Sequence, residues 1–262
     1  MRNSLAAFFS AFLLILAGCS DAAEPDTPPE AHIPGVNTVA VIGAIHGQHR
    51  RSETYSLAVL EAVIVKFDPD VVMVELPPDR YAVAAENYAQ FGEVRESRAD
   101  DFPELIDVVF PLQNQMGFTV VPVAAWSREL ADERRAALKQ IEGDPARTDD
   151  WSAYQSAIQK YGRAVSGKSD NPDFIHSHKY DLAVRTRQES YERLFGSDLG
   201  AGGWEAINRA HFAKMASALD DLDGQEKRIL ILFGAWHKYW ILDALDARSD
   251  IRIADSGTLF SN

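Results

Sequence analysis

The chain has 262 residues, with 26 basic and 39 acidic side chains, so its formal net charge at pH 7 is −13. Such an acidic chain repels phosphate backbones and anionic lipid, which argues against nucleic acid as a partner. Its single cysteine, Cys19, excludes an internal disulfide.

The first residues have the features of a secretion signal. Met1–Gly18 begins with a basic residue, Arg2, followed by a nearly unbroken apolar run from Leu5 to Ala17. That run is close to the ~7–15 residues of a signal-peptide core and shorter than the ~20 that a membrane-spanning helix needs. We therefore predict that residues 1–18 are a cleaved lipoprotein signal peptide.

The end of this signal resembles a bacterial lipobox. Leu16, Ala17 and Gly18 precede Cys19, which would be lipidated and become the first residue of the mature chain. Each buried acyl methylene contributes about 0.8 kcal/mol, so the attached chains would hold the protein at a membrane. Ser20 after the cysteine resembles sorting to the outer membrane of the bacterial envelope. The alternative is an ordinary cleaved signal with an incidental cysteine.

Residues 19–35 are rich in proline, alanine and glutamate and lack hydrophobic periodicity. This composition is typical of a flexible tether. We therefore place a single folded domain at residues 36–262, a length that suits one α/β domain with a sizeable core.

Short, continuously apolar runs in this domain predict buried strands, because strands covered on both faces lack polar alternation. They lie at Val39–Ile42, Val71–Glu75, Thr119–Val123, Arg228–Phe233 and Ile251–Ala254. Apolar residues at helical spacing, with capping residues or glycines at the ends, predict helices between them. These are Ser52–Phe67, a helix starting at Pro77-Pro78, Phe102–Met116, Arg128–Ile141, Asp150–Ala164, Tyr180–Phe195, Trp204–Leu222 and Lys238–Ala247.

The predicted strands flank a helical middle. The β-helix-β spacing of the first two strands makes them parallel, and no strand pattern appears from Trp126 to Asp223. This order predicts one α/β domain with a mixed, mainly parallel central sheet, flanking helices and a helical insertion at about residues 126–223.

Two of the predicted strands are followed by the same motif, Gly-Ala-x-His. Gly43-Ala44-Ile45-His46 follows the first strand, and Gly234-Ala235-Trp236-His237 follows the fourth. Glycine at these positions would let the backbone turn sharply as it leaves the strand. Ligands of open parallel sheets bind outside the carboxyl ends of the strands. We therefore expect His46 and His237 to share one site with Glu75, which ends the second strand.

Two neutral imidazoles and one carboxylate suit a divalent metal such as manganese, cobalt or zinc, with coordination positions left open. A metal held in this way lowers the pKa of water and polarises a carbonyl. Structural alternatives exist: either histidine could be a hydrogen-bonding plug, and Glu75 could be the carboxylate at a helix N-terminus. Arg80, five residues on, would pair with Glu75, bind a substrate carboxylate or carbonyl, or form an exposed salt bridge.

These segments, in this order, resemble the TraB/Tiki (GumN-like) superfamily. The resemblance rests on the two Gly-x-x-His motifs and on the Glu-x4-Arg element from Glu75 to Arg80, and it covers the first and last thirds of the domain. It implies a fold similar to erythromycin esterases and ChaN-like haem-binding lipoproteins. It also implies a metal-dependent, protease-like hydrolase with His46, Glu75 and His237 around the metal and Arg80 orienting the substrate or stabilising an oxyanion.

Trp204–Arg209 is similar to a helical segment that supplies polar groups to the same cleft in these families. The resemblance thus implies a catalytic role for Arg209 and a substrate-binding role for Asn208, although an amphipathic helix packing its apolar face would show the same letters. Arg50, just after the first motif, is a candidate for holding an anionic group of the substrate. The alternative for Arg50 is a solvated basic loop.

Three functions remain open on the sequence. The leading one is a lipid-anchored, metal-dependent hydrolase acting on an amide or ester bond of a peptide or small molecule. In the second, His46 is a general base with Glu75 as its partner and no metal, as in erythromycin esterases. The third is a non-enzymatic lipoprotein that binds haem or a peptide. His176 and His178 add a further metal-binding candidate in a loop rich in glycine and proline.

Overall fold

The structure is a computed structural model that describes residues 33–261, and the residues from Pro34 onward form one compact unit. The predicted signal peptide, the lipobox cysteine Cys19 and most of the predicted tether lie outside the described residues. Among residues 33–261, no helix is long and apolar enough to cross a bilayer.

A five-stranded sheet forms the centre of the unit, with the strand order β3-β2-β4-β1-β5. The strands are β1 (Asn37–Ala44), β2 (Val71–Val74), β3 (Thr119–Pro122), β4 (Arg228–Gly234) and β5 (Ile251–Ile253). Every strand pair in the described part of the chain is parallel. The α/β class is therefore confirmed, whereas the sheet is entirely parallel there instead of mixed.

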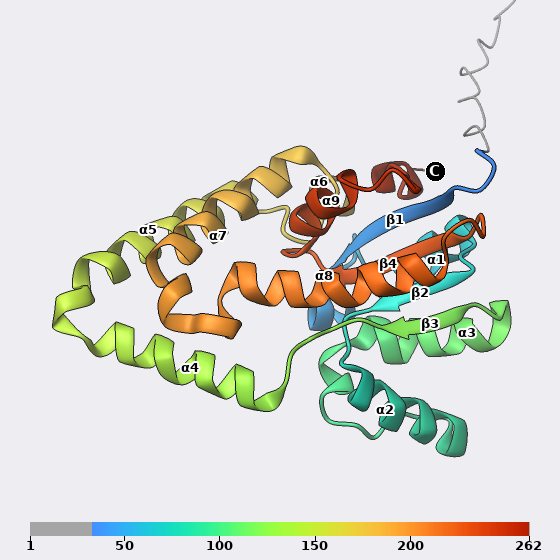
Figure 1. The fold of residues 1–262 in the computed structure, drawn as a ribbon, viewed down its shortest axis with the longest axis horizontal. Helices are drawn as coiled ribbons and strands as arrows, with labels where there is room; N and C mark the ends of the chain where they lie inside the picture. Colours follow the sequence, from blue (N-terminus) through green and yellow to red (C-terminus); the bar gives the residue numbers. More distant parts are fainter. Residues whose placement is uncertain (1–32, 262) are drawn as a thin grey trace, which may run out of the picture. The chain divides into compact units, whose positions relative to one another are not determined.

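Both faces of the sheet are buried, which explains why the strands read as continuous apolar runs. Alternate strand residues point to opposite faces. One face, with Ile42, Val74 and Leu232, packs with residues of α1 (Leu57–Phe67) and of the segment that ends in α3 (Phe110–Met116). The other face packs against α8 (Trp204–Asp221), which crosses in front of the sheet in Figure 1, and against α9 (Lys238–Asp246).

The first helix begins later than the sequence pattern predicted. Ser56 caps α1 by accepting a hydrogen bond from the backbone N–H of Val59. The predicted cap, Ser52, instead accepts a bond from the N–H of Tyr55 in the preceding turn and donates one to Asp170. The prediction of a serine cap was thus correct, but the capping serine is Ser56 and not Ser52, because the side chain of Ser52 is engaged in a tertiary contact.

The middle of the chain is helical. It contains α4 (Arg128–Gly143), α5 (Thr148–Val165), α6 (Pro172–Ile175) and α7 (His178–Leu199), and α2 (Pro78–Phe91) follows β2 earlier in the chain. In Figure 1, α4, α5 and α7 extend to one side of the sheet. Trp236, just after β4, donates a hydrogen bond of 2.8 Å to the hydroxyl of Tyr161 on α5. The helical insertion therefore touches the carboxyl end of the central strand.

The predicted helix at Phe102–Met116 has two parts. A π-helix covers Glu104–Val109 and continues into the α-helix α3. Single π-helical turns within helices are frequent at functional sites, because the wider turn re-aims a side chain. Here the first residue of the π-helix, Glu104, is buried.

Candidate functional site

Three neighbouring strands bring the predicted histidines and Glu75 to one edge of the sheet. β4 lies between β1 and β2, and Ala44 of β1 is level with Gly234 of β4. Glu75 directly follows β2, while His46 and His237 come shortly after the ends of β1 and β4. Their common location follows from the parallel sheet, because the carboxyl ends of parallel strands meet at one edge.

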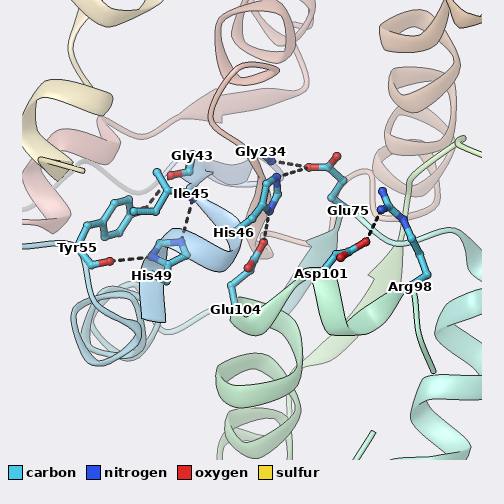
Figure 2. Close-up of polar contacts among 10 residues, drawn as sticks. All are labelled: Gly43, Ile45, His46, His49, Tyr55, Glu75, Arg98, Asp101, Glu104 and Gly234. Carbon is cyan, nitrogen blue, oxygen red and sulfur yellow. Dashed lines mark hydrogen bonds and ion pairs between the residues drawn. The ribbon is translucent and has the colours of Figure 1, made fainter. Parts of the chain in front are cut away.

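His46 and Glu75 face each other next to Gly234 (Figure 2). His46 Nε2 lies 3.8 Å from Glu75 Oε2, and the same oxygen accepts a hydrogen bond of 2.6 Å from the backbone N–H of Gly234. A Cβ at position 234 would lie 2.7 Å from His46 Nε2 and 2.9 Å from Glu75 Oε2. Only glycine leaves room for the two side chains to meet here.

The predicted reason for the motif glycines was therefore wrong. Gly43 and Gly234 lie inside β1 and β4, and neither has a positive φ. A Cβ at Gly43 would lie 3.0 Å from both the Cα and the Cβ of Ala235. Both glycines allow neighbouring groups to approach closely, and neither is needed for a turn.

His46 is held from its other side by Glu104, which the sequence did not single out. His46 Nδ1 lies 2.6 Å from Glu104 Oε1, and the imidazole packs edge-on against Phe102 with 5.1 Å between ring centroids. His46 also has a φ of 50°, in the left-handed region. A residue other than glycine held there costs of order 1–3 kcal/mol, so the surrounding contacts keep a strained histidine in place.

The two carboxylates control the protonation of His46. Burial by itself lowers the pKa of the imidazole, but the hydrogen bond and charge of Glu104, together with the charge of Glu75, outweigh it and raise the pKa to about 9. Burial also raises the pKa of Glu75, against the lowering effects of His46 and of the Gly234 N–H. The arrangement favours a positive charge between the carboxylates, which either a proton or a metal cation supplies.

His237 has a matching arrangement on its own side. Asn208 Oδ1 lies 2.6 Å from His237 Nδ1, and Asn208 Nδ2 donates a hydrogen bond of 2.8 Å to the carbonyl of Trp204. The second bond fixes the orientation of the amide, so Oδ1 accepts the proton of His237 Nδ1. The Trp204 ring stacks on the imidazole with 4.7 Å between centroids. In this tautomer His237 Nε2 carries no proton.

His211 is a further histidine beside His237 that the sequence analysis missed. The two rings are nearly perpendicular, with centroids 5.3 Å apart. His211 Nδ1 accepts a hydrogen bond from the N–H of Ala125, while its Nε2 is buried with no partner among residues 33–261. Burial is the main cause that lowers the pKa of His237 well below its usual value and the pKa of His211 to about 3. Both rings are therefore neutral at pH 7.

A cleft of about 720 Å³ is lined by residues of α2, of the segment before the π-helix and of α4. Two arginines of its lining act electrostatically on the strand-end residues. Burial and the nearer partners have the largest effects on the pKa values of His46 and Glu75, and the charge of Arg98 adds a smaller effect that lowers both. Similarly, the charge of Arg134 adds to the effect of burial on the pKa of His237. Trp126 of the lining lies 6.2 Å from His211 between ring centroids, His211 lies 5.3 Å from His237, and Pro77 of the lining follows Glu75 by two residues. These contacts place the cleft beside the strand ends.

Two of the predicted arginines have carboxylate partners. Arg80 lines the same cleft, where it approaches Asp79 and Glu96 at 3.5 Å each and does not pair with Glu75. Arg50 forms an exposed ion pair with Asp107 at 2.9 Å, and its predicted contact with an anionic substrate group stays a prediction.

The two polar residues predicted on α8 have different locations. Asn208 is 1 % exposed, and its Oδ1 lies 2.6 Å from His237 Nδ1, so it orients this histidine from a buried position. Its contact with a substrate stays a prediction. Arg209 is exposed on α8, and no contact with Asn208, His211 or His237 supports its predicted catalytic role within the described part of the chain.

Two other histidines have structural roles. His49 accepts a hydrogen bond from a backbone N–H through Nε2 and donates one to the carbonyl of Tyr55 through Nδ1. His176 accepts from the N–H of Gly43 through Nε2 and donates to a backbone carbonyl through Nδ1. His178 begins α7, so His176 and His178 do not form the extended metal pair considered from the sequence.

The pH dependence of stability tests the role of His176. Burial, opposed by the hydrogen bond to Pro172 and aided by the charge of Lys238, lowers the pKa of the ring from 6.5 to about 3. Between these values the unfolded chain binds a proton at His176 and the folded chain does not. The contribution of His176 to the free energy of unfolding is therefore fully present above pH 6.5. Below that pH the free energy of unfolding falls by up to about 1.4 kcal/mol per pH unit.

We expect His176→Gln to reduce that slope in urea unfolding measured between neutral pH and about pH 4. A glutamine keeps a donor and an acceptor but does not titrate. An unchanged slope would contradict the assignment.

The side chains at the strand ends are of types that bind divalent metals. Within residues 33–261, no three His, Cys, Asp or Glu side chains already have the mutual geometry of a metal site. Yet His46 and His237 each have Nδ1 engaged and Nε2 left for a ligand, the arrangement that carboxylate or carbonyl partners impose on metal-bound histidines. Glu104 Oε2 is buried with no hydrogen-bond partner in the described part of the chain, and Glu104 and Glu75 line a cavity of about 10 Å³. Such an oxygen is costly to leave unsatisfied, so an additional group is favoured there.

Removing the Asn208 acceptor is expected to weaken metal binding. Asn208→Leu leaves His237 Nδ1–H unpaired and its tautomer unset, which should lower metal affinity by roughly 10- to 100-fold. Asn208→Asp keeps an acceptor and should retain more of the affinity. Titration of cobalt into metal-free protein measures the difference, and equal affinities for wild type and Asn208→Leu would contradict the role assigned to Asn208.

Comparison with models of known protein families, with characterised proteins and with solved structures gives no match. Because one fold supports many activities, the geometry and chemistry of the site decide the function.

Proposed function

We propose that this protein is a lipid-anchored, metal-dependent hydrolase of the TraB/Tiki type that cleaves an amide or ester bond. His46, His237 and Glu75 would hold a divalent ion, and Cys19 would carry the membrane anchor. The lipobox-like end of the signal segment supports the anchor and a location in the bacterial envelope, at the outer membrane. The order of the Gly-x-x-His and Glu-x4-Arg motifs along a parallel α/β fold supports the family.

The observation that carries the proposal is the contrast between two kinds of histidine. His49 and His176 use both ring nitrogens in hydrogen bonds to the protein, as structural plugs do. His46 and His237 use only Nδ1, each toward a buried side-chain acceptor. Their Nε2 atoms make no hydrogen bond within residues 33–261. Two histidines oriented in this way at neighbouring strand ends are suited to bind one ion together.

The surrounding residues have separate roles in this proposal. A divalent ion at this place would activate water and polarise a carbonyl for hydrolysis. Glu104 and Asn208 hold the two imidazoles, and the N–H of Gly234 holds Glu75. Arg80 lines the adjacent cleft, where it would orient the substrate or stabilise developing negative charge.

The metal-free alternative is disfavoured by the electrostatics of His46. A general base must be unprotonated, yet the carboxylates of Glu104 and Glu75 overcome the effect of burial and raise the pKa of His46 to about 9. At neutral pH this ring would carry a proton unless a cation replaced it.

Metal analysis of the purified full chain tests the proposal. After loading with manganese, cobalt or zinc and removal of excess ion, we expect wild type to retain about one ion per chain. The double variant His46→Ala/His237→Ala should retain none. His178→Ala, which removes an exposed histidine at the start of α7, is the matched control and should bind as wild type does.

Equal metal content in wild type and in the double variant would overturn the metal site. Hydrolysis that survives strong chelators but is lost in His46→Ala would favour the metal-free base instead. A Soret band on haem titration, without hydrolysis, would favour a haem-binding lipoprotein.

A further inference from the structure

The cleft beside the strand ends has a mixed charge. Five arginines and four carboxylates line it, in a chain whose net charge is −13. Three of these arginines have carboxylate partners: Arg80 approaches Glu96, Arg98 pairs with Asp101 at 2.8 Å (Figure 2), and Arg135 pairs with Asp132 at 2.8 Å. The two others, Arg128 and Arg134, have no carboxylate partner within residues 33–261, and of these Arg128 is exposed.

Arg134 is held by the protein at several points. Its Nε donates a hydrogen bond of 3.0 Å to the hydroxyl of Tyr191. Its stem runs over Gly202, where a Cβ would lie 3.0 Å from the Cβ of Arg134. The guanidinium carbon lies 5.6 Å from the centre of the Tyr191 ring and 5.9 Å from that of Trp126. The two terminal nitrogens are left without a hydrogen bond to any described residue.

A short series of ring contacts connects Arg134 to the strand-end histidines. Trp126, which also lines the cleft, lies 6.2 Å from His211 between ring centroids, and His211 lies 5.3 Å from His237. Only two rings, those of Trp126 and His211, thus separate Arg134 from His237, a separation that a short peptide can span.

We propose that Arg134 binds a carboxylate of the substrate through its two terminal nitrogens, and that the enzyme therefore prefers peptides with a carboxylate close to the cleaved bond. This inference rests on the proposed hydrolase function. A guanidinium whose Nε is engaged and whose terminal nitrogens are free presents two parallel donors, which match the two oxygens of a carboxylate. The carboxylate can come from an acidic side chain or from the end of the peptide chain.

The charges of the lining favour a peptide carboxylate over a phosphate group. Asp79, Glu96, Glu129 and Asp132 share the cleft with the five arginines, which leaves its lining with one net positive charge. A single carboxylate neutralises that charge, whereas a phosphate dianion would leave an excess of negative charge in the cleft. The same acidic residues suit the cationic or amide groups of a peptide backbone and its other side chains.

Quenched fluorescent peptides test the inference with the full chain in detergent. One set has blocked ends and carries Glu or Gln at each position in turn, and another set has Gln and a free terminal carboxylate. Hydrogen bonds to a charged group predict that a carboxylate peptide is preferred over the blocked Gln peptide by roughly 10- to 100-fold in kcat/KM. The same peptides, titrated into metal-free protein, report binding without cleavage.

Arg134→Gln should reduce this preference to about threefold or less, and Arg134→Lys should retain part of it, because lysine keeps the charge but not the fork of donors. Arg193→Gln is the matched control, since Arg193 is an exposed arginine of α7 outside the cleft, and it should keep the full preference. Unfolding midpoints of all variants establish that they fold.

The two peptide sets distinguish an acidic side chain from a terminal carboxylate, because only the set that carries the recognised carboxylate should be cleaved in preference to the blocked Gln peptide. Cleavage without any carboxylate preference, or a preference that persists in Arg134→Gln, would overturn the inference and leave the hydrolase function intact. Carboxylate-selective binding that depends on Arg134, with no cleavage in any metal-loaded form, would overturn the hydrolase and support the Arg134 site.

Discussion

Gly234→Ala is expected to abolish metal binding and hydrolysis while the protein stays folded. The added Cβ would lie 2.7 Å from His46 Nε2 and 2.9 Å from Glu75 Oε2, closer than real contacts of Cβ atoms allow. Both side chains must therefore move away from residue 234, and His46 and Glu75 would no longer face each other. Because displacing a reacting group by about 1 Å costs on the order of 100-fold in rate, we expect a loss of at least that size in kcat/KM.

The matched control for this variant is Gly47→Ala. Gly47 directly follows His46, but a Cβ there would meet nothing within 4 Å, and its φ is not positive. It should therefore keep metal content and activity. Circular dichroism and metal analysis of both variants distinguish a displaced site from a lost fold. A Gly234→Ala protein with wild-type metal content would contradict the place that we assign to His46 and Glu75.

Lys238→Met is expected to destabilise the protein more than a surface change would. Lys238 is 2 % exposed, and its Nζ lies 2.6 and 2.7 Å from the two carboxylate oxygens of Asp181 on α7. Burial lowers the pKa of Lys238 and raises that of Asp181, and each partner opposes the shift of the other. Methionine would leave Asp181 mostly buried without its partner, which costs about 3 kcal/mol.

The double variant Lys238→Met/Asp181→Leu separates the loss of the pair from the loss of packing. Replacing both charges with apolar groups of similar size is often neutral, so most of the stability should return. Urea unfolding measures both variants. A Lys238→Met protein as stable as wild type would mean that Asp181 finds solvent or another partner.

This ion pair also connects the helical insertion to the proposed site. Lys238 is the first residue of α9 and follows His237 directly, whereas Asp181 belongs to α7. On its other side, His237 is held by Asn208 and Trp204 of α8. Helices that come before β4 in the chain thus position the histidine that follows it, and Lys238→Met should weaken metal binding as well as stability.

The sequence by itself determined the α/β class, the approximate strands and the presence of a histidine after β1 and after β4. These features are local: a strand buried on both faces reads as an apolar run, and a helix shows its own periodicity. The common edge of His46, Glu75 and His237 also followed, because only the direction of the strands is needed to place their ends together.

The tertiary structure alone decided what each of these residues touches. Glu104 binds His46 across 58 residues of chain, and Asn208 binds His237 across 29, so no local pattern encodes either contact. The role of Gly234 depends on which side chains face it. The sequence predicted that this glycine allows a sharp turn, whereas in the fold it allows His46 and Glu75 to approach each other. Tertiary packing decides which groups meet across the fold. It therefore decided which histidines use both ring nitrogens in hydrogen bonds to the protein and which leave Nε2 without one in the described part of the chain.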